Sequence, residues 1–130
     1  MADNSVVIAW FSRSQATPYT DRYYNKLDKD EVVVPSVWPY EFANALAVLE
    51  RRKVLAAALA DEIIASAAKL VTRIDAPPAS PAVLVGLARR HGLSAYDAAY
   101  LELAQRLGVA LAAKDSSLAT AAGKLGVLAP

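Results

Sequence analysis

The stretch Glu31-Val32-Val33-Val34-Pro35-Ser36 (EVVVPS) decides the fold of this 130-residue chain. A continuous apolar run that a proline stops is typical of a short strand buried on both faces, as in a parallel sheet. Ser36 follows as the expected N-cap of a helix that tolerates Pro39 in its first turn and continues to about Arg52. A buried strand followed by a helix indicates an α/β fold in which helices cover a parallel sheet.

Helical and strand-like segments alternate along the rest of the chain. Helices are expected over Ser5–Ser12, Thr20–Leu27, Leu55–Leu70, from the cap Ser80-Pro81 to Gly92, Ser94–Leu107 and Ser116–Ala122. Strands are expected over Val71–Ile74 at the sheet edge, Val109–Ala112 and Gly126–Leu128. We see no repeat or linker, so we expect residues 1–130 to form a single domain.

The composition excludes several classes of protein. The chain is 55% hydrophobic and 21% charged, which argues against disorder, and its net charge of +1 creates no global basic field. It has no cysteine and one histidine, His91, so disulfide scaffolds, thiol nucleophiles and two-histidine metal sites are excluded. The start Met1-Ala2-Asp3 lacks a basic leader, and the apolar stretch Val54–Ala60 cannot cross a bilayer. We therefore expect a soluble cytoplasmic protein with no membrane partner.

Glu41 occupies an unusual position for a carboxylate. It lies on the apolar stripe of its helix, four residues from both Val37 and Ala45. A buried carboxylate is expensive unless it is paired or binds a metal. The alternative is a partly exposed glutamate at the edge of the stripe, bonded to an arginine.

Three aspartates are expected at or near helix starts, and each could be a cap. Asp3 could cap the first helix, Asp115 the helix from Ser116, and Ser94-x-x-Asp97 has capping-box spacing. In an open parallel sheet, however, ligands bind where strand ends meet helix starts. Four acids gathered there would repel one another unless a divalent cation joined them, and oxygen-only ligands select Mg²⁺ or Mn²⁺.

Four segments together resemble the PIN-domain ribonucleases. These are Asp3-Asn4-Ser5-Val6 with Ala9-Trp10-Phe11, Val34-Pro35-Ser36 with Tyr40-Glu41, Leu93-Ser94-Ala95-Tyr96-Asp97-Ala98-Ala99-Tyr100, and Ala113-Lys114-Asp115 through Leu118. Their order and spacing fit over essentially the whole chain, and the chain length fits the VapC-type toxins of toxin–antitoxin pairs.

The resemblance implies a three-layer α/β/α sandwich with about five parallel strands in the order 3-2-1-4-5. It implies a homodimer, a cognate antitoxin, and RNA cleavage by a water that Mg²⁺ or Mn²⁺ activates. The four acids that it assigns as catalytic residues and metal ligands are Asp3, Glu41, Asp97 and Asp115. Ser5 would support the first acid by a hydrogen bond, and Lys114 would support the site as a phosphate contact.

The sequence departs from the family pattern at two places. Only Met1 and Ala2 precede Asp3, where the family has an apolar strand, so either the native chain starts upstream or the first strand is a stub. Ala113 stands where a threonine is common, and the missing hydroxyl is expected to tune activity.

RNA contacts have diffuse support from the sequence. The cations that could contact phosphate are Arg13, Arg51, Arg52, Lys53, Arg89, Arg90 and Lys114, most of which can equally be solvated helix-end charges. Tyr19, Tyr23 and Tyr24 could stack on bases or pack against the sheet or a dimer partner. The first rival function is a catalytically impaired PIN module that binds RNA or a partner protein. A phosphoryl-accepting signalling domain ranks lower, because Leu111–Asp115 lacks the usual strand–lysine ending.

Overall fold

The computed structural model describes residues 1–27, 31–75, 79–114 and 116–130, with the backbone alone at Thr72. These residues form two strands, β1 (Val32–Pro35) and β2 (Val71–Asp75). They also form seven helices: α1 (Asn4–Phe11), α2 (Pro18–Tyr24), α3 (Trp38–Arg51), α4 (Ala57–Leu70), α5 (Pro81–His91), α6 (Ala95–Leu107) and α7 (Ser117–Lys124). Each expected helix is therefore present, with its ends moved by a few residues.

Local capping explains where the helices begin and end. Ser80 caps α5 by accepting a hydrogen bond from the Val83 amide, and Gly92 ends the helix at a left-handed φ of 65°, so both expectations are confirmed. One expected cap is wrong. Ser36 lies in a turn, and α3 starts after Val37, which provides no side-chain cap. Ser116 caps α7 by accepting a hydrogen bond from the Ala119 amide, while Asp115, which could have been this cap, lies outside the described residues.

The expected buried strand is present as β1, which pairs in parallel with β2. Residues Val32–Pro35 are all buried, as the continuous apolar run predicts for a strand covered on both faces. Two further parallel contacts are isolated bridges, one between Ala2 and Ala112 and one between Leu111 and Leu128.

The expected order of five strands is not confirmed. The described residues contain two regular strands in one sheet, and Met1–Asp3 forms hydrogen bonds with residues 110–112 but no described ladder with β1. A groove of about 470 Å³ lies between these parts and is lined in part by Val32, Val33, Val109 and Ala110. Ala2 forms a single bridge, to Ala112, at the place where the resemblance implied the first strand of the sheet.

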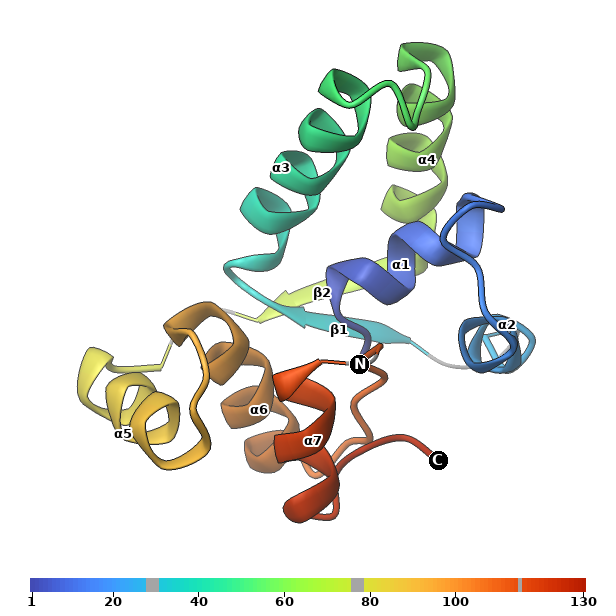
Figure 1. Cartoon of the computed structure of the whole chain (residues 1–130). Coiled ribbons are helices and arrows are strands. Elements are labelled where there is room, and N and C mark those ends of the chain that lie inside the picture. The colour runs from blue at the N-terminus through green and yellow to red at the C-terminus, as the bar shows by residue number, and fades with distance from the viewer. Residues whose placement is uncertain (28–30, 76–78, 115) are drawn as a thin grey trace.

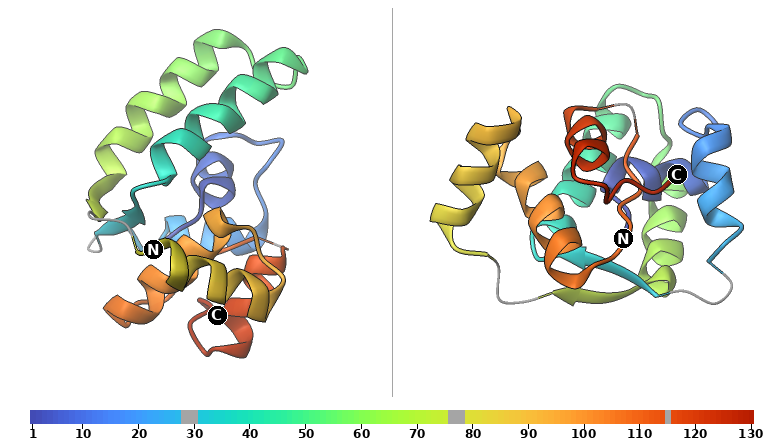
Figure 2. Two further views of the ribbon diagram at one scale, coloured as in Figure 1. Left: turned by 90° about the vertical axis from the view of Figure 1, so that its left-hand side faces the viewer. Right: turned by 90° about the horizontal axis from the view of Figure 1, so that it is seen from below.

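Helices lie on both sides of the β1–β2 sheet, as the α/β prediction required (Figure 1). One group contains α1, α3 and α4, and the other contains α5, α6 and α7 (Figure 1). Figure 2 shows α3 and α4 as neighbours that run antiparallel. The core between the layers is built from buried side chains, among them Val6, Val7, Val34, Phe42, Leu46, Ile63, Leu101, Leu111 and Leu118.

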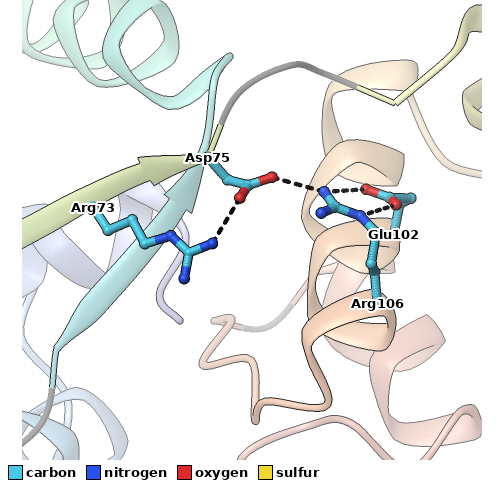
Figure 3. A network of polar contacts seen from close by, with 4 residues as sticks. All are labelled: Arg73, Asp75, Glu102 and Arg106. Carbon is cyan, nitrogen blue, oxygen red and sulfur yellow. Dashed lines mark hydrogen bonds and ion pairs between the residues drawn. The ribbon is translucent and has the colours of Figure 1, made fainter.

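A polar network ties the end of β2 to α6 (Figure 3). The Asp75 carboxylate accepts hydrogen bonds from Arg73, at 3.1 Å, and from Arg106, at 2.8 Å. Arg106 also donates to Glu102, one turn earlier on α6, at 2.6 Å. A carboxylate that two guanidinium groups contact is favoured in its charged form, and these contacts hold the pKa of Asp75 below its usual range.

Candidate functional site: an acidic cluster

Three of the predicted acids, Asp3, Glu41 and Asp97, interact electrostatically although they belong to distant parts of the chain. The negative charge of Asp97 raises the pKa of both Asp3 and Glu41, and the charge of Asp3 also raises that of Glu41. We call these three side chains the acidic cluster. Each comes from the start of a helix, namely the N-cap of α1 and the first turns of α3 and α6.

Asp3 is fixed by the start of α1. Its Oδ1 accepts hydrogen bonds from the Val6 amide at 2.9 Å and from the Ser5 hydroxyl at 2.7 Å, so the expected bond from Ser5 is present. The Asp3 amide donates to the Ala112 carbonyl at 3.0 Å, which holds this residue against the neighbouring segment. Both side-chain bonds use Oδ1, so the cap geometry leaves the second oxygen, Oδ2, to other contacts.

Burial raises the pKa of all three carboxyl groups, and it is the largest cause in each case. Asp3 is only 7% exposed, while Glu41 and Asp97 are half-buried. Hydrogen bonds from Ser5 and Ser94 act in the opposite direction on Asp3 and Asp97. Among the described residues, no ion pair with a lysine or arginine reaches any of the three.

Tyr100 is a member of this site that sequence reasoning quoted in a motif but did not assign. It is 1% exposed, and its hydroxyl and the Oε1 atom of Glu41 are both buried without a hydrogen bond of regular geometry. The two groups nevertheless interact, because the Tyr100 hydroxyl lowers the pKa of Glu41. The spacing of Tyr100 and Asp97, three residues apart on one helix, was the available signal.

Asp97 follows a capped helix start, as the sequence indicated. The Ser94 hydroxyl accepts from the Asp97 amide at 3.1 Å. Ser94 is therefore the N-cap of α6, and Asp97 is the third residue of the helix.

The other predicted site residues have different outcomes. Asp115 lies outside the described residues, so its predicted role stays a prediction. Lys114 is tied to the loop after α1, because its Nζ donates to the Gln15 carbonyl at 2.6 Å. The remaining predicted phosphate contacts are exposed: Arg13, Arg51, Arg52, Lys53, Arg89 and Arg90.

The three tyrosines predicted as possible stacking residues have aromatic neighbours in the protein, although Tyr24 is 44% exposed. Tyr19 and Tyr23 form an edge-on pair with ring centroids 5.0 Å apart, and Tyr24 packs on Trp10 and Phe11. The most exposed large apolar side chains among the described residues are instead Tyr40, at 78%, and Tyr96, at 61%.

The donor set of the acidic cluster suits a hard divalent cation, because it offers carboxylate oxygens and no nitrogen or sulfur. The buried Glu41 Oε1, which lacks a hydrogen-bond donor, is the atom that such an ion would satisfy. Across residues 1–27, 31–75, 79–114 and 116–130, no three ligand-type side chains stand close enough together to enclose an ion. The chemistry of the cluster thus fits a metal, and the fourth predicted acid, Asp115, lies outside the described residues.

The fold and the site define an α/β domain with an acidic cluster at the starts of three helices. The chain belongs to the PIN domain family, whose model matches residues 1–124. PIN domains are generally nucleases and usually use divalent metals. No curated protein matches the chain.

A solved structure is similar to this fold. It is described as the crystal structure of PAE2754 from Pyrobaculum aerophilum, and the two chains share 21% sequence identity with a TM-score of 0.64. The match covers 92% of this chain and 82% of the other chain. At this identity the likeness supports the fold.

No helix formed by the described residues has the length and apolar character needed to cross a membrane.

Proposed function

We propose that this protein is a metal-dependent endoribonuclease that hydrolyses phosphodiester bonds in RNA. The observation that carries the proposal is the acidic cluster: three partly buried carboxylates held at helix starts, with no ion pair to a cationic side chain of the described residues. Burying carboxylate charge costs free energy, and a bound cation would offset that cost. Such costly groups are typical of functional sites. Membership of the PIN domain family supports the same reading.

The protein's own residues would prepare the site. Asp3, Glu41 and Asp97, with Asp115 as the fourth predicted acid, would hold Mg²⁺ or Mn²⁺. Ser5 fixes one oxygen of Asp3 through its 2.7 Å hydrogen bond, which limits how that carboxylate can rotate. When bound, the cation supplies Lewis-acid charge at the scissile phosphodiester.

RNA would approach over the exposed starts of α3 and α6. Tyr40 precedes Glu41 and Tyr96 precedes Asp97, so each tyrosine adjoins an acid of the cluster in the chain. Exposed aromatic rings are platforms on which single-stranded bases stack, regardless of sequence. We expect Tyr40→Ala and Tyr96→Ala to weaken RNA binding without altering the acids.

The biological role that we propose is that of a VapC-type toxin. On this proposal the protein is a cytoplasmic homodimer, and a cognate antitoxin protein inhibits it. Co-expression tests this role, because a neighbouring small protein that binds the chain and blocks RNA cleavage would act as an antitoxin.

Cleavage of labelled single-stranded RNA tests the activity. The assay compares the wild type with Asp97→Asn, first with Mn²⁺ and then with EDTA. We expect cleavage by the wild type with Mn²⁺ alone, and none by the folded Asp97→Asn protein under either condition. Cleavage that continues in EDTA, or in Asp97→Asn, would refute the proposed site.

The second candidate function is a catalytically impaired PIN module that binds RNA or a partner protein. Two observations favour it: the single bridge at Ala2 and the absence, within the described part of the chain, of three closely gathered ligand side chains. A folded wild type that binds RNA but neither binds Mn²⁺ nor cleaves would select this alternative.

A further inference from the structure

Two buried polar atoms of the acidic cluster lack a regular hydrogen bond: the hydroxyl of Tyr100 and Oε1 of Glu41. The two side chains nevertheless interact with each other. A buried donor or acceptor without a partner costs free energy, so such pairs are uncommon unless a ligand completes them. Tyr100 itself is 1% exposed, and it projects from α6 three residues after Asp97.

Three carboxylates act electrostatically on the Tyr100 hydroxyl, namely those of Glu41, Asp3 and Asp97. A phenol has an ordinary pKa of about 10, so it carries its proton at neutral pH. A protonated phenol among carboxylates can act toward them only as a hydrogen-bond donor. Glu41 interacts with it most strongly of the three.

We propose that Tyr100 is a positioning residue of the acidic cluster: when a divalent cation binds, the Tyr100 hydroxyl donates a hydrogen bond to the Glu41 carboxylate and holds it toward the ion. This inference rests on the proposed function. A neutral donor suits the task, because it aims the carboxylate without cancelling the negative charge that attracts the cation. A lysine or arginine at this place would orient Glu41 equally well but would neutralise the site. Donors that orient metal ligands in this way commonly change metal affinity by about 10- to 100-fold.

Isothermal titration of the protein with Mn²⁺ tests the role of the hydroxyl. The Tyr100→Phe variant removes one oxygen and keeps the buried ring, so the packing of this side chain in the core is preserved. We expect Mn²⁺ to bind this variant about 10-fold more weakly than the wild type. The melting temperature of the metal-free protein is expected to stay within about 2 °C, because the lost hydroxyl has no regular hydrogen bond there.

Two further variants show whether Tyr100 acts through Glu41. In a Glu41→Ala background the acceptor is gone, so adding Tyr100→Phe is expected to change Mn²⁺ affinity by less than about 2-fold. Tyr23→Phe is the matched control, because its hydroxyl donates to the Pro130 carbonyl and no carboxylate of the cluster acts on it. This control is expected to bind Mn²⁺ like the wild type.

Each outcome decides the inference. Wild-type affinity in Tyr100→Phe would overturn it, and so would a loss that persists in the Glu41→Ala background. A lower metal-free melting temperature with unchanged affinity would make Tyr100 a purely structural residue. If the wild type itself does not bind Mn²⁺, the proposed metal-dependent function fails and this inference fails with it. If the wild type binds Mn²⁺ and only the Tyr100 effect is missing, the function stands without the inference.

Discussion

Asp3 and Asp75 are buried to nearly the same extent, at 7% and 9% exposure, yet they lie in opposite environments. Asp75 receives hydrogen bonds from Arg106 and Arg73, and these lower its pKa (Figure 3). Asp3 receives one from a hydroxyl and one from an amide, and burial together with the charge of Asp97 raises its pKa. The same functional group is thus stabilised in one region and left uncompensated in the other.

The difference separates a structural contact from a candidate site. The Asp75 network joins β2 to α6 and already has its cations within the protein. The acidic cluster joins α1, α3 and α6 but has no cationic side chain among its described contacts, which leaves room for an external cation. A buried carboxylate without a cationic partner lowers the stability of the folded protein but can bind an external cation.

The largest expected difference between the two regions is in activity. Asp97→Asn is expected to reduce RNA cleavage by more than about 100-fold, because it removes a proposed ligand from the site. Asp75→Asn is expected to change cleavage by less than about 3-fold, since it disturbs a contact outside the cluster. Rates measured with Mn²⁺ on the same labelled RNA check this, with circular dichroism to verify folding. Equal losses in the two variants would contradict the distinction.

The next effect concerns stabilisation by a divalent cation. At a Mn²⁺ concentration about 100 times the Kd, the wild type is expected to gain about 2.7 kcal/mol in unfolding free energy. Glu41→Gln is expected to gain much less, while Asp75→Asn should gain as much as the wild type. Urea unfolding of the three proteins, in Mn²⁺ and in EDTA without added metal, measures the gain in unfolding free energy for each. A full gain in Glu41→Gln would show that Glu41 does not bind the cation.

The Asp75 network should give a smaller effect on stability that depends on salt. Asp75→Asn is expected to cost about 1 kcal/mol, because the arginine partners are about half exposed to solvent. The pKa of Asp75 is lowered in the folded protein, so its contribution is present at neutral pH and is lost as the pH falls through that lowered pKa. Urea unfolding of both proteins at pH 7 and in acid, at low and high salt, measures the contribution. A cost that persists in acid would show that the carboxylate charge is not its source.

The smallest expected effect is a gain in stability on substitution of Glu41, opposite in sign to the loss expected for Asp75→Asn. The pKa of Glu41 is raised in the folded protein, so folding favours the protonated form of this side chain. Its contribution to the unfolding free energy is fully present below the unfolded pKa and is lost as the pH rises through the folded pKa. Removing the charge with Glu41→Gln is therefore expected to stabilise the metal-free protein by about 0.5 kcal/mol at pH 7. This gain should disappear toward about pH 4. Melting temperatures in EDTA across this pH range check the sign, and a lower melting temperature at pH 7 would make Glu41 a structural residue.

Short-range signals predicted the elements well, because their causes are local. The run of valines ending at Pro35 forms β1, and Ser80 with Gly92 bounds α5 as expected. The error in helix capping occurred at α3, where Ser36 lies in a turn and the helix starts after Val37 without a side-chain cap. Residue types alone cannot place such a start, because it depends on the backbone path into the helix.

Sequence periodicity placed Glu41 on an apolar face and Asp97 in a first turn, and it thereby determined which acids were candidates. Only the tertiary structure decided their surroundings. Packing brings Tyr100 to Glu41, 59 positions away in the chain, and it brings Arg106 to Asp75 across 31 residues. Local sequence controls backbone geometry through caps and side-chain volume. The protonation state of a carboxylate depends on burial and on charges that distant segments supply, so it becomes defined only when the helices pack.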